Sequence, residues 1–146
     1  YIGDKELLKE LKHKYRVSGE KRYINVIPGA QETIKTLKEK GFTIVLLTAR
    51  PYKKYPRIFA DTIEWLNKNN IIYDAIIWDE NKEERILKEF PGMKFMLEDC
   101  FENAVKISSE NKKVILFDKT YNKGSGDNIY RVNDWSEVLK VIEDDI

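Results

Sequence analysis

Short apolar runs alternate with amphipathic segments along most of this chain, and that alternation restricts the fold more than any other feature. Phe42 to Leu47 is an almost unbroken apolar run with β-branched residues, typical of a strand buried on both faces. Further strands are predicted at residues 73–78, 95–97, 114–117 and 129–132, with helices between and after them. Because strands and helices alternate with short links, the sequence predicts an α/β domain with a parallel, doubly wound sheet.

The predicted helices have recognisable ends. Pro28-Gly29-Ala30 opens one helix, which Gly41 is well placed to end. Pro56 opens a longer helix that frays at residues 67–70, with apolar side chains predicted to face inward at Ile58, Phe59, Ile63 and Leu66. Three later helices are expected at residues 83–90, 101–108 and 135–142, the last of them capped by Asp134.

Composition narrows the class of protein. The 146 residues are 42% hydrophobic and 35% charged, which is typical of a globular domain with a charged surface. Lys and Arg total 26 against 25 Asp and Glu, so bulk charge gives no argument for nucleic acid or an anionic membrane as a partner. No apolar run approaches the ~18 residues of a membrane span. The oligomeric state cannot be inferred from these features.

The single cysteine, Cys100, excludes an intramolecular disulfide and fits a reducing, cytoplasmic compartment. It lies beside two acidic residues, so a role as nucleophile has to be considered. The one histidine, His13, lies far away in a lysine-rich segment, which gives little support to a Cys–His pair. A small packing residue is the preferred interpretation.

Polar residues follow two of the predicted strands at the point where each strand ends. Thr48-Ala49-Arg50 follows the first apolar run, and Glu98-Asp99 follows the run at residues 95–97. Carboxyl ends of parallel strands share one edge of a sheet, where ligands bind. A hydroxyl followed by backbone N–H groups can hold an anion, although threonine in such a run is also an ordinary strand former.

Adjacent carboxylates repel each other unless a cation or a hydrogen-bond donor lies nearby. Glu98 and Asp99 therefore suit Mg²⁺, which prefers one or two carboxylates together with substrate oxygens and water. The alternative is that Asp99 caps the helix starting at Phe101 while Glu98 is solvated, and the two interpretations can coexist. Lys82, just past the strand at residues 73–78, could balance the charge of a phosphate or be one of many surface lysines.

The order of these residues resembles motifs two, three and four of the haloacid dehalogenase-like (HAD) hydrolase superfamily. Those motifs are a strand-end threonine, a lysine after the next strand and an acidic pair after a later one. Pro28-Gly29-Ala30 is also similar to the 5′(3′)-deoxyribonucleotidase, or type C 5′-nucleotidase, branch. The same branch is also similar in a later stretch, residues 116–122 (Leu-Phe-Asp-Lys-Thr-Tyr-Asn). That stretch is followed by Tyr130-Arg131-Val132 and Asp134-Trp135. The resemblance covers about residues 24 to 142.

The resemblance implies a Rossmann-like three-layer fold and Mg²⁺-dependent hydrolysis of a phosphate monoester through an aspartyl-phosphate. Thr48 would bind the phosphoryl oxygens, with Ala49 and Arg50 as further phosphate contacts. Lys82 would hold nucleophile and phosphate together, with Lys88 as the reserve candidate. Asp99 would ligate Mg²⁺, with Glu98 assisting directly or through water. A small phosphorylated substrate, a (deoxy)nucleoside monophosphate, is expected, and Tyr52, Tyr55 and Trp78 either stack on its base or simply pack.

One element of the family pattern is missing. The nucleophile is the first Asp of a DxD motif at the end of a strand, and no such motif follows a strand in residues 1–146. In the family that strand lies between the strands ending at Thr48 and at Asp99. We therefore expect residues 25–146 to be a HAD-like core without its central strand, and residues 1–24 to be the remnant of a small helical cap. The nucleophile strand would come from an upstream segment or from another chain.

Three functions are compatible with these features. The first is a Mg²⁺-dependent phosphatase of the 5′-nucleotidase kind, in which the 146 residues alone would be inactive. The second is a non-catalytic HAD-like module that binds a phosphorylated ligand or a partner protein. The third, a phosphatase acting on nucleic-acid ends, would need a basic groove, against which the near-zero net charge argues.

Overall fold

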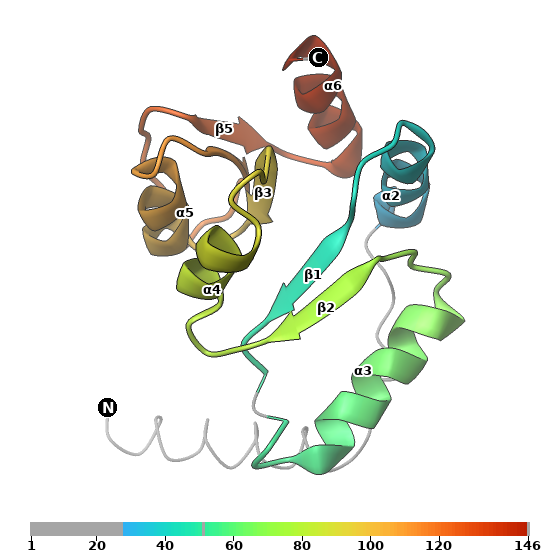
Figure 1. Cartoon of the computed structure of the whole chain (residues 1–146). Coiled ribbons are helices and arrows are strands. Elements are labelled where there is room, and N and C mark those ends of the chain that lie inside the picture. Colours follow the sequence, from blue (N-terminus) through green and yellow to red (C-terminus); the bar gives the residue numbers. More distant parts are fainter. Residues whose placement is uncertain (1–27, 51, 146) are drawn as a thin grey trace.

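The computed structural model describes residues 28–50 and 52–145 (Figure 1). This part of the chain contains five strands and five helices, with a helix between successive strands except the last two, as the sequence predicts. The strands are β1 (Val45–Thr48), β2 (Ala75–Trp78), β3 (Phe95–Glu98), β4 (Lys113–Phe117) and β5 (Ile129–Val132). The helices are α2 (Ala30–Glu39), α3 (Pro56–Lys68), α4 (Lys82–Glu89), α5 (Phe101–Ser108) and α6 (Trp135–Asp145). The cap remnant predicted at residues 1–24 lies outside the described residues.

The strands form two separate hydrogen-bonded groups. β1 pairs with β2, with Thr48 opposite Trp78, and the other group has the order β3-β4-β5. β3 and β4 pair from Phe95 with Lys113 to Glu98 with Leu116. Within the described residues, no strand pairs with the second edge of β1 or of β3. The ladder is thus interrupted between β1 and β3, which is the place expected for the missing strand.

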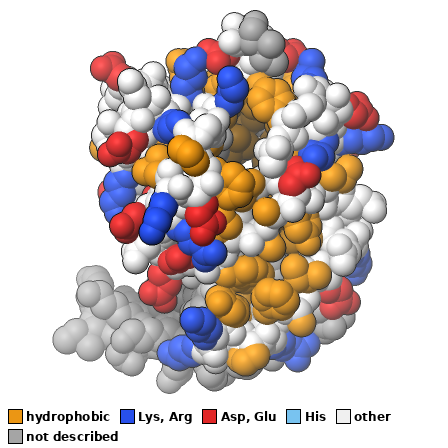
Figure 2. All heavy atoms as spheres, in the orientation of Figure 1, with side chains coloured by type: hydrophobic (Ala, Val, Ile, Leu, Met, Phe, Trp, Pro, Cys, Tyr) orange, Lys and Arg blue, Asp and Glu red, His pale blue; other side chains and the backbone are white. Residues whose placement is uncertain are grey.

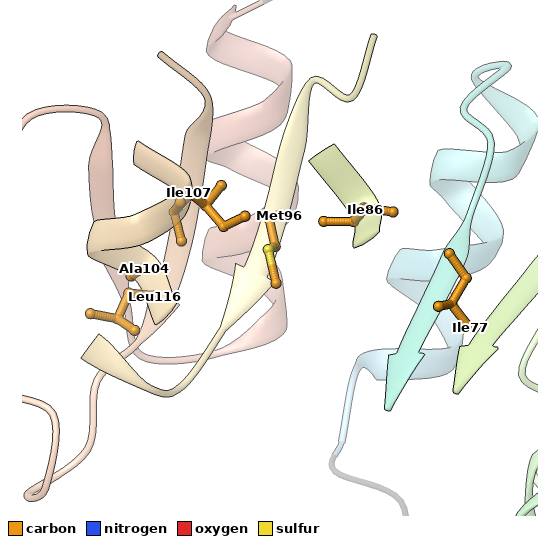
Figure 3. Close-up of a cluster of buried hydrophobic side chains, with 7 residues drawn as sticks. Ile77, Ile86, Met96, Ala104, Ile107 and Leu116 are labelled. Carbon is orange, nitrogen blue, oxygen red and sulfur yellow. The ribbon is translucent and has the colours of Figure 1, made fainter. Parts of the chain in front are cut away.

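Both groups nevertheless contribute to the same helix-covered layers. Side chains from one face pack with Ile86 of α4 and with Ala104 and Ile107 of α5 (Figure 3). They are Val45, Leu47, Ile77, Met96, Val114 and Leu116. On the opposite face, Ile115 and Leu97 pack with α2 and α6, while Leu46 and Ile76 pack with α2 and α3. The arrangement is a three-layer α/β fold with helices on both faces.

The interruption leaves β1 less buried than its sequence predicts. All four residues of β1 are only half-buried, whereas Val114, Ile115 and Leu116 in the middle of β4 are 0% exposed. A strand with apolar side chains on both faces is normally covered on both faces and paired on both edges. β1 therefore has the composition of a central strand but the surroundings of an edge strand.

Helix ends follow the sequence signals closely. Gly29, with φ +92°, is the N-cap of α2, and Gly41, with φ +93°, follows its last turn. Such positive φ values favour glycine. The Asp134 carboxylate accepts a hydrogen bond of 2.9 Å from the backbone N–H of Glu137, so the predicted cap of α6 is confirmed. No helix within residues 28–50 and 52–145 has the length and apolarity to span a membrane.

Candidate active site at the carboxyl edge

Thr48 is the last residue of β1, and local hydrogen bonds fix its position. Its Oγ1 accepts from the backbone N–H of Arg50 at 3.1 Å, and its carbonyl accepts from the N–H of Asp79 at 3.0 Å. The second bond holds the ends of β1 and β2 together. A threonine hydroxyl that accepts one bond retains its own O–H as a donor. Thr48 can therefore still donate to a phosphoryl oxygen.

The two residues after Thr48, Ala49 and Arg50, differ in their exposure and in their contacts. Ala49 is exposed, so its backbone can be approached from solvent. The Arg50 guanidinium donates to the hydroxyl of Thr62 on α3 at 2.8 Å, and Thr62 is buried. Arg50 thus ties the loop after β1 to α3, and this contact would have to be exchanged or shared for Arg50 to reach a phosphate.

Glu98, the last residue of β3, is buried and has partners for both oxygens. Oε1 accepts from the backbone N–H groups of Asp99 and Cys100, each at 3.1 Å, and Oε2 lies 3.5 Å from Nζ of Lys82. The prediction that Asp99 caps α5 is wrong. The N-cap is Cys100, and its side chain makes no capping hydrogen bond. Instead, the Glu98 carboxylate accepts hydrogen bonds from the N–H groups of Asp99 and Cys100, just before the helix.

Lys82 is the first residue of α4, and its ammonium reaches across to Glu98 from the end of the β1–β2 group. Glu83, which is also buried, lies 3.9 Å from the same Nζ. Lys88 is exposed and lies in the last turn of α4, about 9 Å further along the helix axis at 1.5 Å per residue. Of the two candidate lysines, only Lys82 lies at the carboxyl edge.

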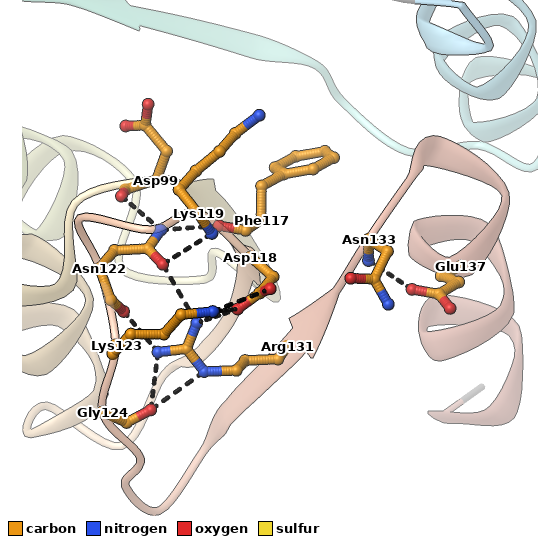
Figure 4. A network of polar contacts seen from close by, with 10 residues as sticks. All are labelled: Asp99, Phe117, Asp118, Lys119, Asn122, Lys123, Gly124, Arg131, Asn133 and Glu137. Atoms are coloured by element: carbon orange, nitrogen blue, oxygen red, sulfur yellow. Dashed lines mark hydrogen bonds and ion pairs between the residues drawn. The ribbon is translucent and has the colours of Figure 1, made fainter.

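Asp99 differs from Glu98 in being exposed. Its Oδ2 accepts from the Tyr121 hydroxyl at 2.7 Å, and its backbone carbonyl accepts from the side-chain amide of Asn122 at 2.7 Å (Figure 4). The hydrogen bond to the Asp99 carboxylate raises the pKa of Tyr121, because deprotonation would place two anions side by side. Asp99 therefore presents a carboxylate to solvent from a fixed backbone.

The candidate residues from both strand groups lie at one edge of the fold. The Lys82–Glu98 contact joins the end of the β1–β2 group to the end of β3. The arrows of β1 and β3 point the same way in Figure 3. Thr48, Lys82, Glu98 and Asp99 are thus found where the parallel strands end, the region in which α/β proteins bind ligands.

Three aromatic rings contact one another beside Thr48. Trp78, the register partner of Thr48, lies 5.4 Å from Tyr52 and 5.1 Å from Phe59 between ring centroids. Phe59 is 44% exposed, so the prediction that it faces inward is wrong. Figure 2 shows apolar side chains gathered at the surface over β1, β2 and the start of α3. The rings pack with one another, and base stacking stays a prediction.

Comparison with known proteins places the chain in a family. Residues 4–144 match the sequence profile described as 5′ nucleotidase, deoxy (Pyrimidine), cytosolic type C protein. The chain belongs to this type C 5′-nucleotidase family. The HAD superfamily and the branch predicted from the short motifs are confirmed.

Similar proteins agree with this assignment. A Chlorobaculum tepidum protein named "Putative 5′(3′)-deoxyribonucleotidase" is 24% identical over 135 residues, which cover 90% of this chain and 63% of that protein. This chain thus spans less than two thirds of that relative. D,D-heptose 1.7-bisphosphate phosphatase from B. bronchiseptica, crystallised with magnesium and phosphate, superposes with a TM-score of 0.62 at 12% identity, covering 83% of this chain and 85% of that one.

A predicted phosphatase from Clostridium acetobutylicum gives a second structural match. It has a TM-score of 0.57 at 25% identity, covering 80% of this chain and 59% of that one. Both solved structures are phosphatases by name, and their superposition confirms the HAD-like, Rossmann-like fold class for the type C 5′-nucleotidase-like chain.

The donor set of this nucleotidase-like chain suits Mg²⁺ in part. Asp99 offers a hard, exposed oxygen ligand, with the buried Glu98 directly behind it. Within the described residues, no three His, Cys, Asp or Glu side chains cluster closely enough to hold a metal. Any further ligands would therefore have to come from water, from a bound substrate or from residues outside the described part of the chain.

Two contributors to this edge were not found by reasoning from residue types. Tyr121 and Asn122 both bond to Asp99 from the loop after β4. The available signal was their place in residues 116–122, the stretch that resembles the nucleotidase branch. Cys100 was interpreted as a packing residue, and burial raises the pKa of its thiol, which disfavours the reactive thiolate.

Proposed function

We propose that this protein is a Mg²⁺-dependent phosphatase that hydrolyses a phosphate monoester, with a (deoxy)nucleoside monophosphate as substrate. Family membership and the C. tepidum relative support the substrate class. The observation that carries the proposal is the Lys82–Glu98 contact of 3.5 Å. It brings the hydroxyl-bearing end of β1 and the acidic end of β3 to a single edge.

Each residue has a proposed part. The Thr48 hydroxyl and the Ala49 backbone bind phosphoryl oxygens, and Lys82 offsets the charge of phosphate and nucleophile. Arg50 is a further phosphate contact once its hydroxyl partner on α3 is exchanged. Asp99 ligates Mg²⁺, and Glu98 assists by fixing the Asp99 N–H and by holding Lys82. When bound, the metal would neutralise charge on the transferred phosphoryl group.

The nucleophile is proposed to enter on a strand that pairs between β1 and β3. Both of these strands have an edge without a partner strand among the described residues, and β1 is only half-buried. An aspartate at the end of that strand would attack phosphorus, and the ester oxygen would leave with a proton from a second acid. Water would then hydrolyse the aspartyl-phosphate. No strand-end DxD occurs in the 146 residues, so this strand is proposed to come from outside them, either from an upstream segment or from another chain.

The test is phosphate release by the complete gene product. We expect a panel of nucleoside and deoxynucleoside monophosphates to give malachite-green signal with Mg²⁺ and none with EDTA. Residues 1–146 alone, assayed beside it, should release no phosphate. Activity that persists in EDTA would contradict metal dependence.

A second function is favoured by the missing motif itself. If the complete gene product also lacks a strand-end DxD, a non-catalytic HAD-like module that binds a phosphorylated ligand is preferred. Inorganic phosphate or vanadate binding without turnover would then be expected. Sequencing the gene upstream of Tyr1 distinguishes the two before any assay.

A further inference from the structure

The loop between β4 and β5 contains the most deeply buried polar side chain among the described residues. Asn122 is 1% exposed, and its side-chain amide uses its full hydrogen-bonding capacity. Nδ2 donates to the carbonyls of Asp99 and Phe117, each at 2.7 Å. Oδ1 accepts from the N–H of Lys119 at 2.9 Å and from Arg131 at 3.1 Å (Figure 4).

These four bonds fix the orientation of the amide. Two carbonyls lie on one side of it and two donors on the other, so a flipped amide would lose every bond. Phe117 is the last residue of β4, and Asp99 directly follows β3. Asn122 therefore holds the ends of two neighbouring strands together at the candidate active site.

Arg131 on β5 locks the loop in place. Its guanidinium donates to the Asp118 carboxylate at 2.9 Å, to the Gly124 carbonyl at 2.7 Å, and to both the side chain and the backbone carbonyl of Asn122. Gly124 has φ +143°, and a Cβ there would lie 2.6 Å from the Phe101 ring at the start of α5. The loop is thus anchored both to β5 and to the helix that follows Asp99.

We propose that Asn122, held by Arg131, is a positioning residue that sets the direction of the Asp99 carboxylate toward Mg²⁺; this inference rests on the function proposed above. The Asp99 peptide is fixed on both sides, because its N–H bonds to Glu98 and its carbonyl to Asn122. The side chain between these bonds is exposed, and one of its two carboxylate oxygens, Oδ2, accepts from the Tyr121 hydroxyl at 2.7 Å. Substituting a residue that orients a metal ligand commonly weakens metal affinity by about 10-fold to 100-fold.

The test is Mg²⁺ binding by the complete protein, measured by isothermal titration calorimetry without substrate. Asn122→Ala should raise the Mg²⁺ dissociation constant about tenfold. Arg131→Lys keeps the positive charge near Asp118 but loses the fork to Asn122, and it should raise the constant in the same direction. Asp74→Asn is the control: Asp74 accepts from Lys38 and from the Ile44 N–H at the other end of the strands, so Mg²⁺ affinity should not change.

The possible outcomes are distinct. Wild-type affinity in both Asn122→Ala and Arg131→Lys would overturn the inference while leaving the proposed function intact. If Asn122→Ala does not fold, Arg131→Lys decides by the same criterion. If the wild-type protein itself binds no Mg²⁺, the proposed function fails and the positioning role fails with it. Equal weakening in Asp74→Asn would show general destabilisation and would also overturn the inference.

Discussion

The ammonium of Lys82 lies 3.5 Å from the buried carboxylate of Glu98, and this pair joins two strand groups that share no hydrogen-bonded ladder. Glu98 is 4% exposed at its side chain, and Lys82 is 20% exposed. A buried carboxylate needs a compensating charge or donors. The contact therefore serves packing as well as chemistry, since it neutralises Glu98 and places a cation beside the candidate phosphate site.

Lys82→Gln is expected to abolish phosphate release by the complete protein and to destabilise the fold by about 1–3 kcal/mol, since Glu98 loses its cation. Lys88→Gln is the matched control, because Lys88 is exposed in the last turn of the same helix. It should keep full activity and shift stability by no more than about 0.5 kcal/mol. Malachite-green assay and urea unfolding measure the two effects. Loss of activity in Lys88→Gln alone would reverse the assignment of the two lysines.

Thr48→Ala is expected to weaken inhibition by vanadate about tenfold or more, which corresponds to losing one hydrogen bond to a charged group. The fold should survive, because the lost side chain contributes only one accepted bond from the Arg50 N–H. Thr43→Ala, at an exposed position before the same strand, is the control. An unchanged vanadate inhibition constant in Thr48→Ala would return Thr48 to the role of an ordinary strand residue.

Periodicity predicted the alternation of elements well because each buried strand and helix face carries its own apolar pattern. α5 was predicted with both ends correct, and β5 likewise, since polar or turn residues bound them closely. β1 begins at Val45 rather than Phe42, because the ladder with β2 only starts opposite Ala75. Where a strand begins and ends depends on the strand it pairs with, and the apolar run of one strand does not reveal its pairing partner.

The site was only partly predictable for a related reason. Thr48, Lys82, Glu98 and Asp99 stand out because each follows an apolar run. The cap of α5 was assigned to Asp99 by its position, yet the Glu98 side chain folds back onto those N–H groups. Asn122 was overlooked, because an asparagine in a turn-rich loop gives no sign that it will be buried against a strand end 23 residues away.

Asp99→Asn is expected to raise the Mg²⁺ dissociation constant of the complete protein at least about tenfold, because a neutral amide replaces the proposed charged ligand. Extra Mg²⁺ should then restore part of the activity. Asp79→Asn is the control. The Asp79 carboxylate accepts from the Asn81 N–H at the end of β2, so it already has a local partner, and Mg²⁺ affinity should not change. Calorimetric titration and activity at graded Mg²⁺ are the measurements. Full activity of Asp99→Asn at low Mg²⁺ would contradict the metal assignment.

Acid should destabilise this fold through its paired aspartates. Hydrogen bonds from Lys123, with help from Arg131, lower the pKa of Asp118 in the folded chain. A group with a lowered folded pKa stabilises above its unfolded pKa, about 3.9 for aspartate, and that stability is lost as the pH falls through the folded pKa. Urea unfolding between pH 7 and pH 2 should show this loss, and Asp118→Asn should make it smaller. Asp127→Asn, at an exposed position of the same loop, is the control variant.

Gly124→Ala is expected to destabilise the fold by about 1–3 kcal/mol, because the residue has φ +143° and its new Cβ would meet the Phe101 ring at 2.6 Å. Gly92→Ala is the matched control: nothing lies within 4 Å of a Cβ at Gly92. Urea unfolding should show a lower midpoint for the first variant and little change for the second. Phe101→Leu, combined with Gly124→Ala, should recover part of the loss by making room for the methyl group. Equal stability of the two alanine variants would mean that Gly124 is not in close contact with Phe101 at the start of α5.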